Sequence, residues 1–198
     1  MRPSVLIFSG SNRAGSLNEQ LADVVAGFAT QAGAQVSRLR LRDYPLPLYS
    51  ADLDQAGPPP AALALKEIFA MHAAWIICSP EYNGSYTGLL KNAIDWVSSP
   101  VKNHPLWSDS YRPFEGKVVG LLSASPGGLG GVRSLDPLQT LLSNLRCWVS
   151  PYRYALARAD QALQAAEGLP AASAFAVREV VRKTLWAAKG LQLAGHPA

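Results

Sequence analysis

The stretch SVLIFSGSNRAGSLN, residues 4–18, indicates the fold. Residues 4–8 form a continuous apolar run, which is typical of a strand buried on both faces of a parallel sheet. A helix is expected next, because apolar residues recur at steps of three and four over residues 17–33. Ser16, followed three residues later by Glu19, predicts a capping box at its start.

The same alternation of strand and helix continues along the chain. Further strand patterns occupy residues 35–41, 73–78, 117–122 and 147–155, and helical spacing occupies residues 65–72, 87–97, 135–145 and 172–190. Pro137 allows two starts for the third of these helices: Asp136 as its N-cap with Pro137 at the first position, or an earlier residue. Residues 43–60, rich in proline and aromatic residues, predict a long ordered loop.

This alternation predicts an α/β fold: a flavodoxin-like, doubly wound, five-stranded parallel sheet of order 2-1-3-4-5 with helices on both faces. No repeat or interdomain linker is evident, so residues 1–198 are expected to form a single domain. Ligands of such sheets bind at the carboxyl ends of the strands, at the switch point between strands one and three. The loops that follow Phe8, Cys78 and Leu122 are therefore expected to share one site.

Composition excludes several classes of function. The chain has 198 residues, 48% of them hydrophobic, and 18 Lys and Arg against 14 Asp and Glu, which excludes a disordered chain. The net charge is +4, and the Lys and Arg residues are scattered along the sequence, which favours solvated surfaces over a nucleic-acid site. No apolar run approaches a membrane span or a signal peptide, so no membrane partner is expected. Two cysteines without a CxxC pair predict a reducing, cytoplasmic location and no metal site.

The first loop, residues 10–18, has the composition of an anion site. Hydroxyl groups, the guanidinium of Arg13 and backbone N–H groups at a helix N-terminus suit a phosphate. The spacing matches neither a Walker loop nor GxGxxG, so a monophosphate fits better than a nucleoside triphosphate or a dinucleotide. The alternative is that Ser16 only caps the helix and Arg13 is solvated.

The second and third loops could hold a planar ring. Within residues 79–88, Pro80 stiffens the chain, Asn83-Gly84 permits positive φ, and Tyr82 offers a stacking surface. Residues 123–131 have small side chains that would let a planar ligand lie against the backbone. Either loop could instead be a purely structural turn.

Residues 10–18, 80–96 and 125–128 together resemble the NAD(P)H-dependent FMN reductase family, which includes quinone, chromate and azo-dye reductases of flavodoxin-like fold. The resemblance spans residues 4–155 in order and spacing. Two departures are evident: Thr87 stands where the family usually has proline, and residues 104–112 form a longer stretch than usual.

The resemblance implies one FMN-binding domain over residues 1–198. It assigns the FMN phosphate to Ser11, Arg13, Ser16, Asn18 and the backbone of Leu17, and the isoalloxazine and ribityl edge to Pro80, Glu81, Tyr82, Asn83, Gly84 and Ser85. Ser125 and Gly127 are assigned to the other side of the ligand. Residues 88–96 are expected to pack on the sheet and to contribute to a subunit contact, in a homodimer or homotetramer.

The reaction implied is that of an FMN-dependent NAD(P)H oxidoreductase. NADH or NADPH would reduce the flavin and leave, after which a quinone, azo dye, chromate or free flavin would accept two electrons, in a ping-pong scheme. No catalytic side chain is expected, because the flavin carries the chemistry. The alternative is a non-catalytic flavin-binding electron carrier or redox sensor, which the positive net charge disfavours.

The remaining histidines and tryptophans are expected to be structural. His72 is predicted to pack on a helix face, and His104 and His196 to be solvated. Trp75 and Trp148 are predicted to lie in the core, whereas Trp107, in the longer stretch, is a candidate for lining a substrate entrance.

Overall fold

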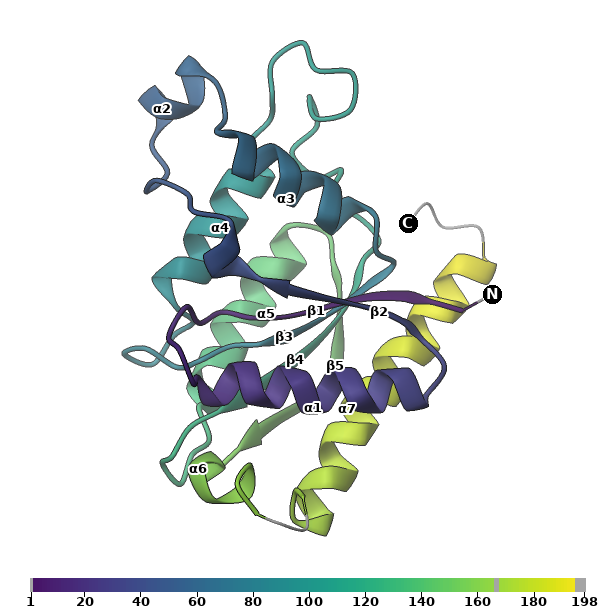
Figure 1. Cartoon of the computed structure of the whole chain (residues 1–198). Helices are drawn as coiled ribbons and strands as arrows, with labels where there is room; N and C mark the ends of the chain where they lie inside the picture. The colour runs from purple at the N-terminus through teal and green to yellow at the C-terminus, as the bar shows by residue number, and fades with distance from the viewer. Residues whose placement is uncertain (1, 166–167, 195–198) are drawn as a thin grey trace.

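The computed structural model describes residues 2–165 and 168–194. Its five parallel strands lie in the order β2-β1-β3-β4-β5, which confirms the predicted flavodoxin-like topology (Figure 1). The strands are β1 (Ser4–Ser9), β2 (Gln35–Arg40), β3 (Ala74–Cys78), β4 (Val118–Ala124) and β5 (Trp148–Leu156).

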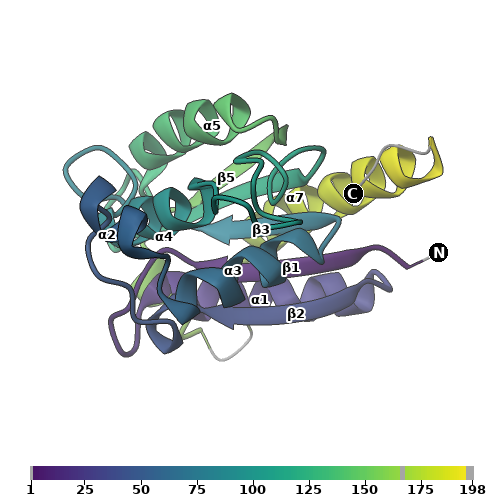
Figure 2. The same cartoon turned by 90° about the horizontal axis from the view of Figure 1, so that it is seen from above.

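Helices cover both faces of the sheet (Figures 1 and 2). One face is covered by α1 (Leu17–Gln31) and α7 (Ala171–Leu193), and the other by α3 (Pro60–Ala70), α4 (Gly88–Ser98) and α5 (Leu135–Asn144). Short helices η1 (Leu41–Asp43), α2 (Ala51–Ala56), η2 (Val132–Ser134) and α6 (Ala159–Ala162) lie in the connections. Within β1, Leu6 and Phe8 face one layer and Val5 and Ile7 the other, as the period of two requires.

The start of α1 differs in part from the capping box. The Ser16 hydroxyl accepts the N–H of Asn18 at 3.2 Å, but the Glu19 carboxylate accepts from Arg38 of β2 at 3.1 Å instead of returning to the cap. The Arg38 guanidinium, which also donates to the carbonyl of Ile7 at 2.6 Å, is a stronger partner for a carboxylate than a backbone N–H. The second half of the predicted capping box is therefore wrong.

Two segments refine the sequence expectations. Helix α5 begins at Leu135, the earlier of the two starts, so Pro137 lies in the first turn, where a missing N–H breaks no helical hydrogen bond. Residues 43–60 are not a continuous loop, because the Ser50 hydroxyl accepts from the N–H of Leu53 and begins α2. The prediction missed α2 because a six-residue helix without a buried side chain has no apolar periodicity.

The long connection between β2 and α3 is fastened to α4. The Asn92 amide donates to the carbonyl of Pro47 at 3.0 Å and accepts from the N–H of Tyr49 at 2.8 Å. The indole of Trp96 donates to the same Pro47 carbonyl at 2.8 Å. Asn92 and Trp96, which lie in the stretch 80–96 that resembles the family, therefore fix this connection in place.

Within the described residues, no helix has both the length and the apolar character needed to cross a bilayer. The two cysteines are free and buried: Cys78 ends β3, and Cys147 directly precedes β5. Trp75 is buried in the core as predicted. The prediction for Trp148 is wrong, because β5 is an edge strand and 57% of this residue is exposed.

Candidate functional site

The three loops predicted to share a site meet at the carboxyl ends of β1, β3 and β4. They enclose a cavity of about 190 Å³ lined by Ser11, Arg13, Ser16, Leu17, Asn18, Pro80, Glu81, Tyr82, Ala124, Ser125 and Pro126. All predicted residues of the first loop therefore lie together with the start of the second loop and with Ser125. Four other predicted residues, Asn83, Gly84, Ser85 and Gly127, do not line this cavity.

The first loop is folded by its own hydroxyl groups. The N–H of Ser11 donates to the Ser9 hydroxyl at 3.1 Å, and the N–H of Arg13 donates to the Ser11 hydroxyl at 3.3 Å. The Arg13 side chain is exposed and takes part in none of the ion pairs found among the described residues. Its positive charge is thus available to an anion at the N-terminus of α1.

Asn18 joins the first loop to the third. Its side-chain amide donates to the carbonyl of Ala124 at 2.8 Å and accepts the N–H of Ala124 at 3.0 Å. The residue is 3% exposed, so this pair of hydrogen bonds is shielded from water. Asn18 therefore fixes the start of α1 against the end of β4, across the floor of the cavity.

The second loop contains a tight hairpin turn. The N–H of Tyr82 donates to the carbonyl of Ser85 at 2.9 Å and the N–H of Ser85 returns to Tyr82 at 3.1 Å, while Asn83 and Gly84 have φ of 52° and 80°. These angles are those of a type I′ turn, which needs residues that tolerate positive φ. Tyr82 remains 55% exposed at its edge, as a stacking surface requires.

Glu81 is neutralised by a residue that the sequence did not indicate. Its carboxylate accepts from Nε of Arg133 at 2.6 Å and from the Arg133 backbone N–H at 3.1 Å. The Glu81 side chain is only 9% exposed, whereas Arg133, in η2, is 64% exposed. This pair cancels the negative charge that Glu81 would otherwise present to an anion in the cavity. Its members lie 52 residues apart, and no local pattern links them.

The third loop is held against the end of β5. The Ser123 hydroxyl donates to the carbonyl of Gly130 at 2.9 Å, and the carbonyl of Gly127 accepts from the N–H of Arg158 at 3.2 Å. Gly130 has φ of +63°, and a Cβ there would lie 2.7 Å from the backbone of residues 155–157. At this position glycine is therefore required by the fold itself.

Thr87, the departure from the family pattern, is a buried structural residue. Its hydroxyl donates to the carbonyl of Gly10 at 2.5 Å and accepts the N–H of Leu90 at 3.2 Å, which caps α4. A Cβ at Gly10 would lie 3.2 Å from that hydroxyl. Thr87 thus joins the first loop to the start of α4.

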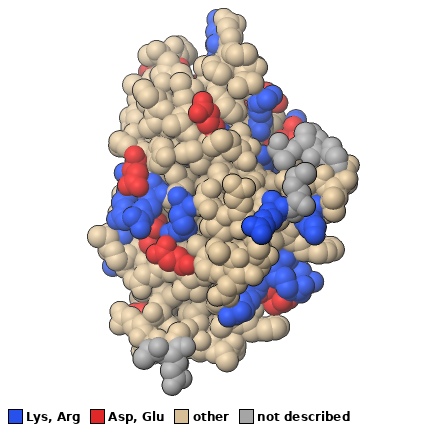
Figure 3. All heavy atoms as spheres, turned by 45° about the vertical axis from the view of Figure 1, so that its right-hand side comes forward, with Lys and Arg blue, Asp and Glu red and all other residues tan. Residues whose placement is uncertain are grey.

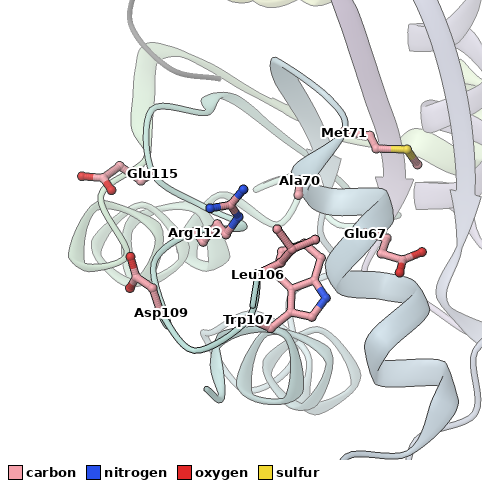
Figure 4. A pocket seen from close by; sticks show the side chains of 8 residues that line it. All are labelled: Glu67, Ala70, Met71, Leu106, Trp107, Asp109, Arg112 and Glu115. Atoms are coloured by element: carbon pink, nitrogen blue, oxygen red, sulfur yellow. The ribbon is translucent and has the colours of Figure 1, made fainter. Parts of the chain in front are cut away.

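The structure does not place Trp107 at the site. Trp107 is 4% exposed and belongs to a separate cavity of about 540 Å³, where Leu106 and Arg112 lie opposite Ala70 (Figure 4). Ala70 shortly precedes β3, and Glu115 of the same cavity shortly precedes β4, so this cavity lies toward the amino ends of the strands. The prediction of Trp107 at a substrate entrance is wrong, because α4 carries the chain back to the amino ends of the strands before residue 99.

The buried groups whose pKa is shifted do not line the cavity. Burial lowers the pKa of Lys66 and of Lys117 to about 8; Lys66 donates to the carbonyls of Val97 and Ser99, and Lys117 to that of Ala70. Burial raises the pKa of both cysteine thiols. The described residues contain no group of His, Cys, Asp and Glu suited to a metal ion.

Comparison with known proteins agrees with this geometry. Residues 3–161 match the model of a family described as NADPH-dependent FMN reductase. The chain is 36% identical over 139 residues to an NAD(P)H-dependent FMN reductase of Pseudomonas aeruginosa, covering 70% of this chain and 68% of that protein. It is 36% identical over 140 residues to a quinone reductase of Escherichia coli, with the same shares covered.

A solved structure is also similar. FerB, a flavoenzyme NAD(P)H:(acceptor) oxidoreductase from Paracoccus denitrificans, superimposes with a TM-score of 0.77 at 25% identity, covering 95% of this chain and 98% of that one. The sheet order, the meeting of the three loops and these matches lead to one conclusion: the chain belongs to the NADPH-dependent FMN reductase family.

Proposed function

We propose that this chain is an FMN-dependent NAD(P)H oxidoreductase that reduces quinones or similar small acceptors. The observation that carries the proposal is the cavity at the switch point, which collects an available cation, hydroxyl groups and an exposed tyrosine from three separate loops. The family and the relatives support an oxidoreductase, since the relatives include proteins named FMN reductase and quinone reductase. Residues 1–198 would act as one FMN-binding domain, in the cytoplasm, where two free buried cysteines would stay reduced.

The residues present fit the two ends of FMN. Arg13, Ser11 and Ser16 would hold the phosphate together with the backbone of Leu17, because a free guanidinium and hydroxyls at a helix N-terminus suit a dianion. Asn18 would contribute by fixing the loop, since its amide binds Ala124.

The ring would lie over the second and third loops. Pro80, Tyr82 and the turn of Asn83, Gly84 and Ser85 would support one edge, with Ser125 and Gly127 on the other side. The N–H groups of Tyr82 and Ser85 are used within the turn, so other backbone donors would face the ring. Glu81, paired with Arg133, would contribute its backbone and not a free charge.

When bound, FMN would supply the redox chemistry, a two-electron transfer from NADH or NADPH to a quinone, azo dye, chromate or free flavin in alternating half-reactions. For a quinone the balance is NAD(P)H, a proton and quinone giving NAD(P)⁺ and hydroquinone. The task of the chain is then to hold and orient the ligand and to place positive charge near its phosphate. No nucleophilic side chain is required.

The size of the cavity supports an oligomer. At about 190 Å³ it is smaller than the roughly 300–1,000 Å³ that is typical of small-molecule pockets. One chain would thus enclose the phosphate end and leave the ring partly uncovered. We propose that a second subunit, in a homodimer or homotetramer, completes the ring side.

An absorption spectrum tests the proposal. The purified protein is mixed with FMN, freed of excess ligand, and titrated anaerobically with NADH or NADPH and then with a benzoquinone. Retained flavin bands that bleach and then return support the oxidoreductase. Retained bands that do not bleach indicate the carrier or sensor instead, and loss of flavin during removal of excess ligand overturns the three-loop assignment.

A further inference from the structure

The exposed tryptophans of this chain lie on one face, formed by β5 and α7. Trp75, Trp96 and Trp107 are buried, whereas Trp148 and Trp186 are 57% and 71% exposed. A groove of about 520 Å³ lies between the two elements, lined by both of these indoles together with Tyr152 and Lys183. Large aromatic side chains that gather at one exposed groove are typical of an interaction surface.

The outer surface of α7 carries both apolar and cationic residues. Its large exposed side chains recur at steps of three and four and form one stripe, which consists of Phe175, Arg178, Arg182, Trp186, Lys189 and Leu193. Phe175 is 68% exposed and Leu193 75%. We name this stripe, with Lys183, Trp148 and Tyr152 beside it, the α7 face. Figure 3, in which the α7 side of the molecule comes forward, shows Lys and Arg side chains gathered there with uncharged surface between them.

The charge of the α7 face is strongly positive. Helix α7 carries four cations against the single carboxylate of Glu179, which binds Arg182 at 2.7 and 2.8 Å. Two of the other three cations lie against aromatic rings: Arg178 is 4.2 Å from the ring centre of Phe28, and Lys183 is 5.1 Å from that of Tyr152. Neither of these two cations takes part in an ion pair found among the described residues, so their charge is balanced by no carboxylate.

These features disfavour a second copy of the chain as the partner. An isologous contact would bring the cations of the two α7 helices together, which costs free energy. Strand addition to β5 is disfavoured too, because the pairing with β4 passes from Val119 opposite Val149 to Leu121 opposite Arg153. The extra residues bulge out and bend the edge, which makes it a poor template.

We propose that the α7 face binds peripherally to an anionic lipid bilayer. Arg178, Lys183 and Lys189 would lie among lipid phosphates, with Trp186 and Phe175 at the level of the headgroups, where aromatic rings are favoured. This goes beyond the proposed function, and none of these residues lines the candidate cavity. It revises the expectation of no membrane partner, which rested on the lack of a spanning segment and not on the surface.

Vesicle sedimentation tests this inference on the full FMN-loaded chain. Vesicles of phosphatidylcholine alone are compared with vesicles of phosphatidylcholine and phosphatidylglycerol in equal parts. We expect binding only to the anionic vesicles, weakened by salt and accompanied by a blue shift of tryptophan fluorescence. Lys183→Gln and Lys189→Gln should each lower the partition coefficient about fivefold, and Trp186→Ala by at least about fivefold.

Matched controls are available elsewhere on the surface. Lys102→Gln removes another exposed lysine and Leu48→Ala another exposed apolar side chain, and neither should change binding. Circular dichroism melting verifies that each variant folds. The inference is overturned if anionic vesicles do not bind the protein at low salt, or if the controls lower binding as much as the α7 variants. It is equally overturned if Trp186→Ala leaves binding unchanged, or if sedimentation equilibrium shows that Trp186→Ala breaks an oligomer.

Discussion

The hydroxyl of Thr87 donates to the carbonyl of Gly10 over 2.5 Å, while it accepts the N–H of Leu90, in the first turn of α4. One buried side chain thus ties the candidate phosphate loop to the helix that follows the second loop. Thr87→Val keeps the shape and removes both hydrogen bonds, so we expect the free energy of unfolding to fall by about 2–3 kcal/mol. Urea denaturation measures this loss. Thr87→Ser, which keeps the hydroxyl, should restore most of it, and equal losses for both variants would argue against the hydrogen bonds.

Asn18 should stabilise the fold through its hydrogen bonds to Ala124, so a loss of stability in Asn18→Asp should come from these bonds and not from the added charge alone. In Asn18→Asp the carbonyl of Ala124 loses its donor and faces a buried carboxylate, so we expect a loss of about 2–3 kcal/mol in unfolding free energy. Asn12→Asp adds the same charge to the same loop at an exposed position and is the matched control. Thermal and urea unfolding of the two variants would contradict this role if they gave the same loss.

Arg13 should affect ligand binding without affecting stability. Its side chain is exposed and its charge would meet the FMN phosphate, so Arg13→Gln should weaken FMN binding about tenfold to a hundredfold. Flavin fluorescence quenching gives the dissociation constant. Arg112→Gln removes an exposed guanidinium at the other cavity and should leave the constant unchanged. A normal constant for Arg13→Gln would remove this residue from the proposed site.

Two glycines of the third loop should differ sharply when changed to alanine. At Gly130 the new Cβ would overlap the backbone of residues 155–157 at positive φ, whereas at Gly128 no atom lies within 4 Å. We expect Gly130→Ala to lower the free energy of unfolding by more than about 2 kcal/mol, or to prevent folding, and Gly128→Ala to change it by less than about 0.5 kcal/mol. Urea denaturation of the pair checks this, and equal stability would show that the loop relaxes freely.

Lys66 should make stability depend on pH in the alkaline range. Burial lowers its pKa in the folded state to about 8 from 10.5, so between these values the unfolded chain binds more protons and the free energy of unfolding rises with pH. We expect the wild type to gain up to about 3 kcal/mol relative to Lys66→Met between pH 8 and 10.5. The difference in unfolding free energy between the two proteins isolates the effect of Lys66. The buried thiols, whose raised pKa acts in the opposite direction, are present in both proteins and cancel in this difference. A difference that stays constant across this range would contradict the assignment, and exposed Lys102→Met is the control.

The sheet and the meeting of the three loops were predictable because they follow from local patterns. Continuous apolar runs such as residues 4–8 mark central parallel strands, and topology then brings their carboxyl ends together. The turn of Asn83 and Gly84 was predictable for the same local reason, since few residues tolerate its angles.

What the sequence did not show depends on partners distant along the chain. Glu19 turns to Arg38, Glu81 to Arg133 and Asn18 to Ala124, and none of these pairs has a fixed spacing. Trp148 follows a strand pattern, yet its exposure depends on β5 being the last strand of the sheet. The order of the strands in the sheet decides which strands are covered on both sides. This order cannot be predicted from the spacing of residues within one strand.

The burial of Cys78 and Cys147 has a chemical consequence for the proposed reduction of quinones. Quinones are electrophiles and add to thiolates, so an accessible cysteine would be alkylated by the very compounds that the protein is proposed to reduce. Here Cys78 is fully buried, Cys147 is 8% exposed, and the pKa of each is raised, which keeps the thiols protonated and out of reach. Quinones would therefore find no accessible thiolate on this chain to alkylate, and the protein would not be inactivated in this way.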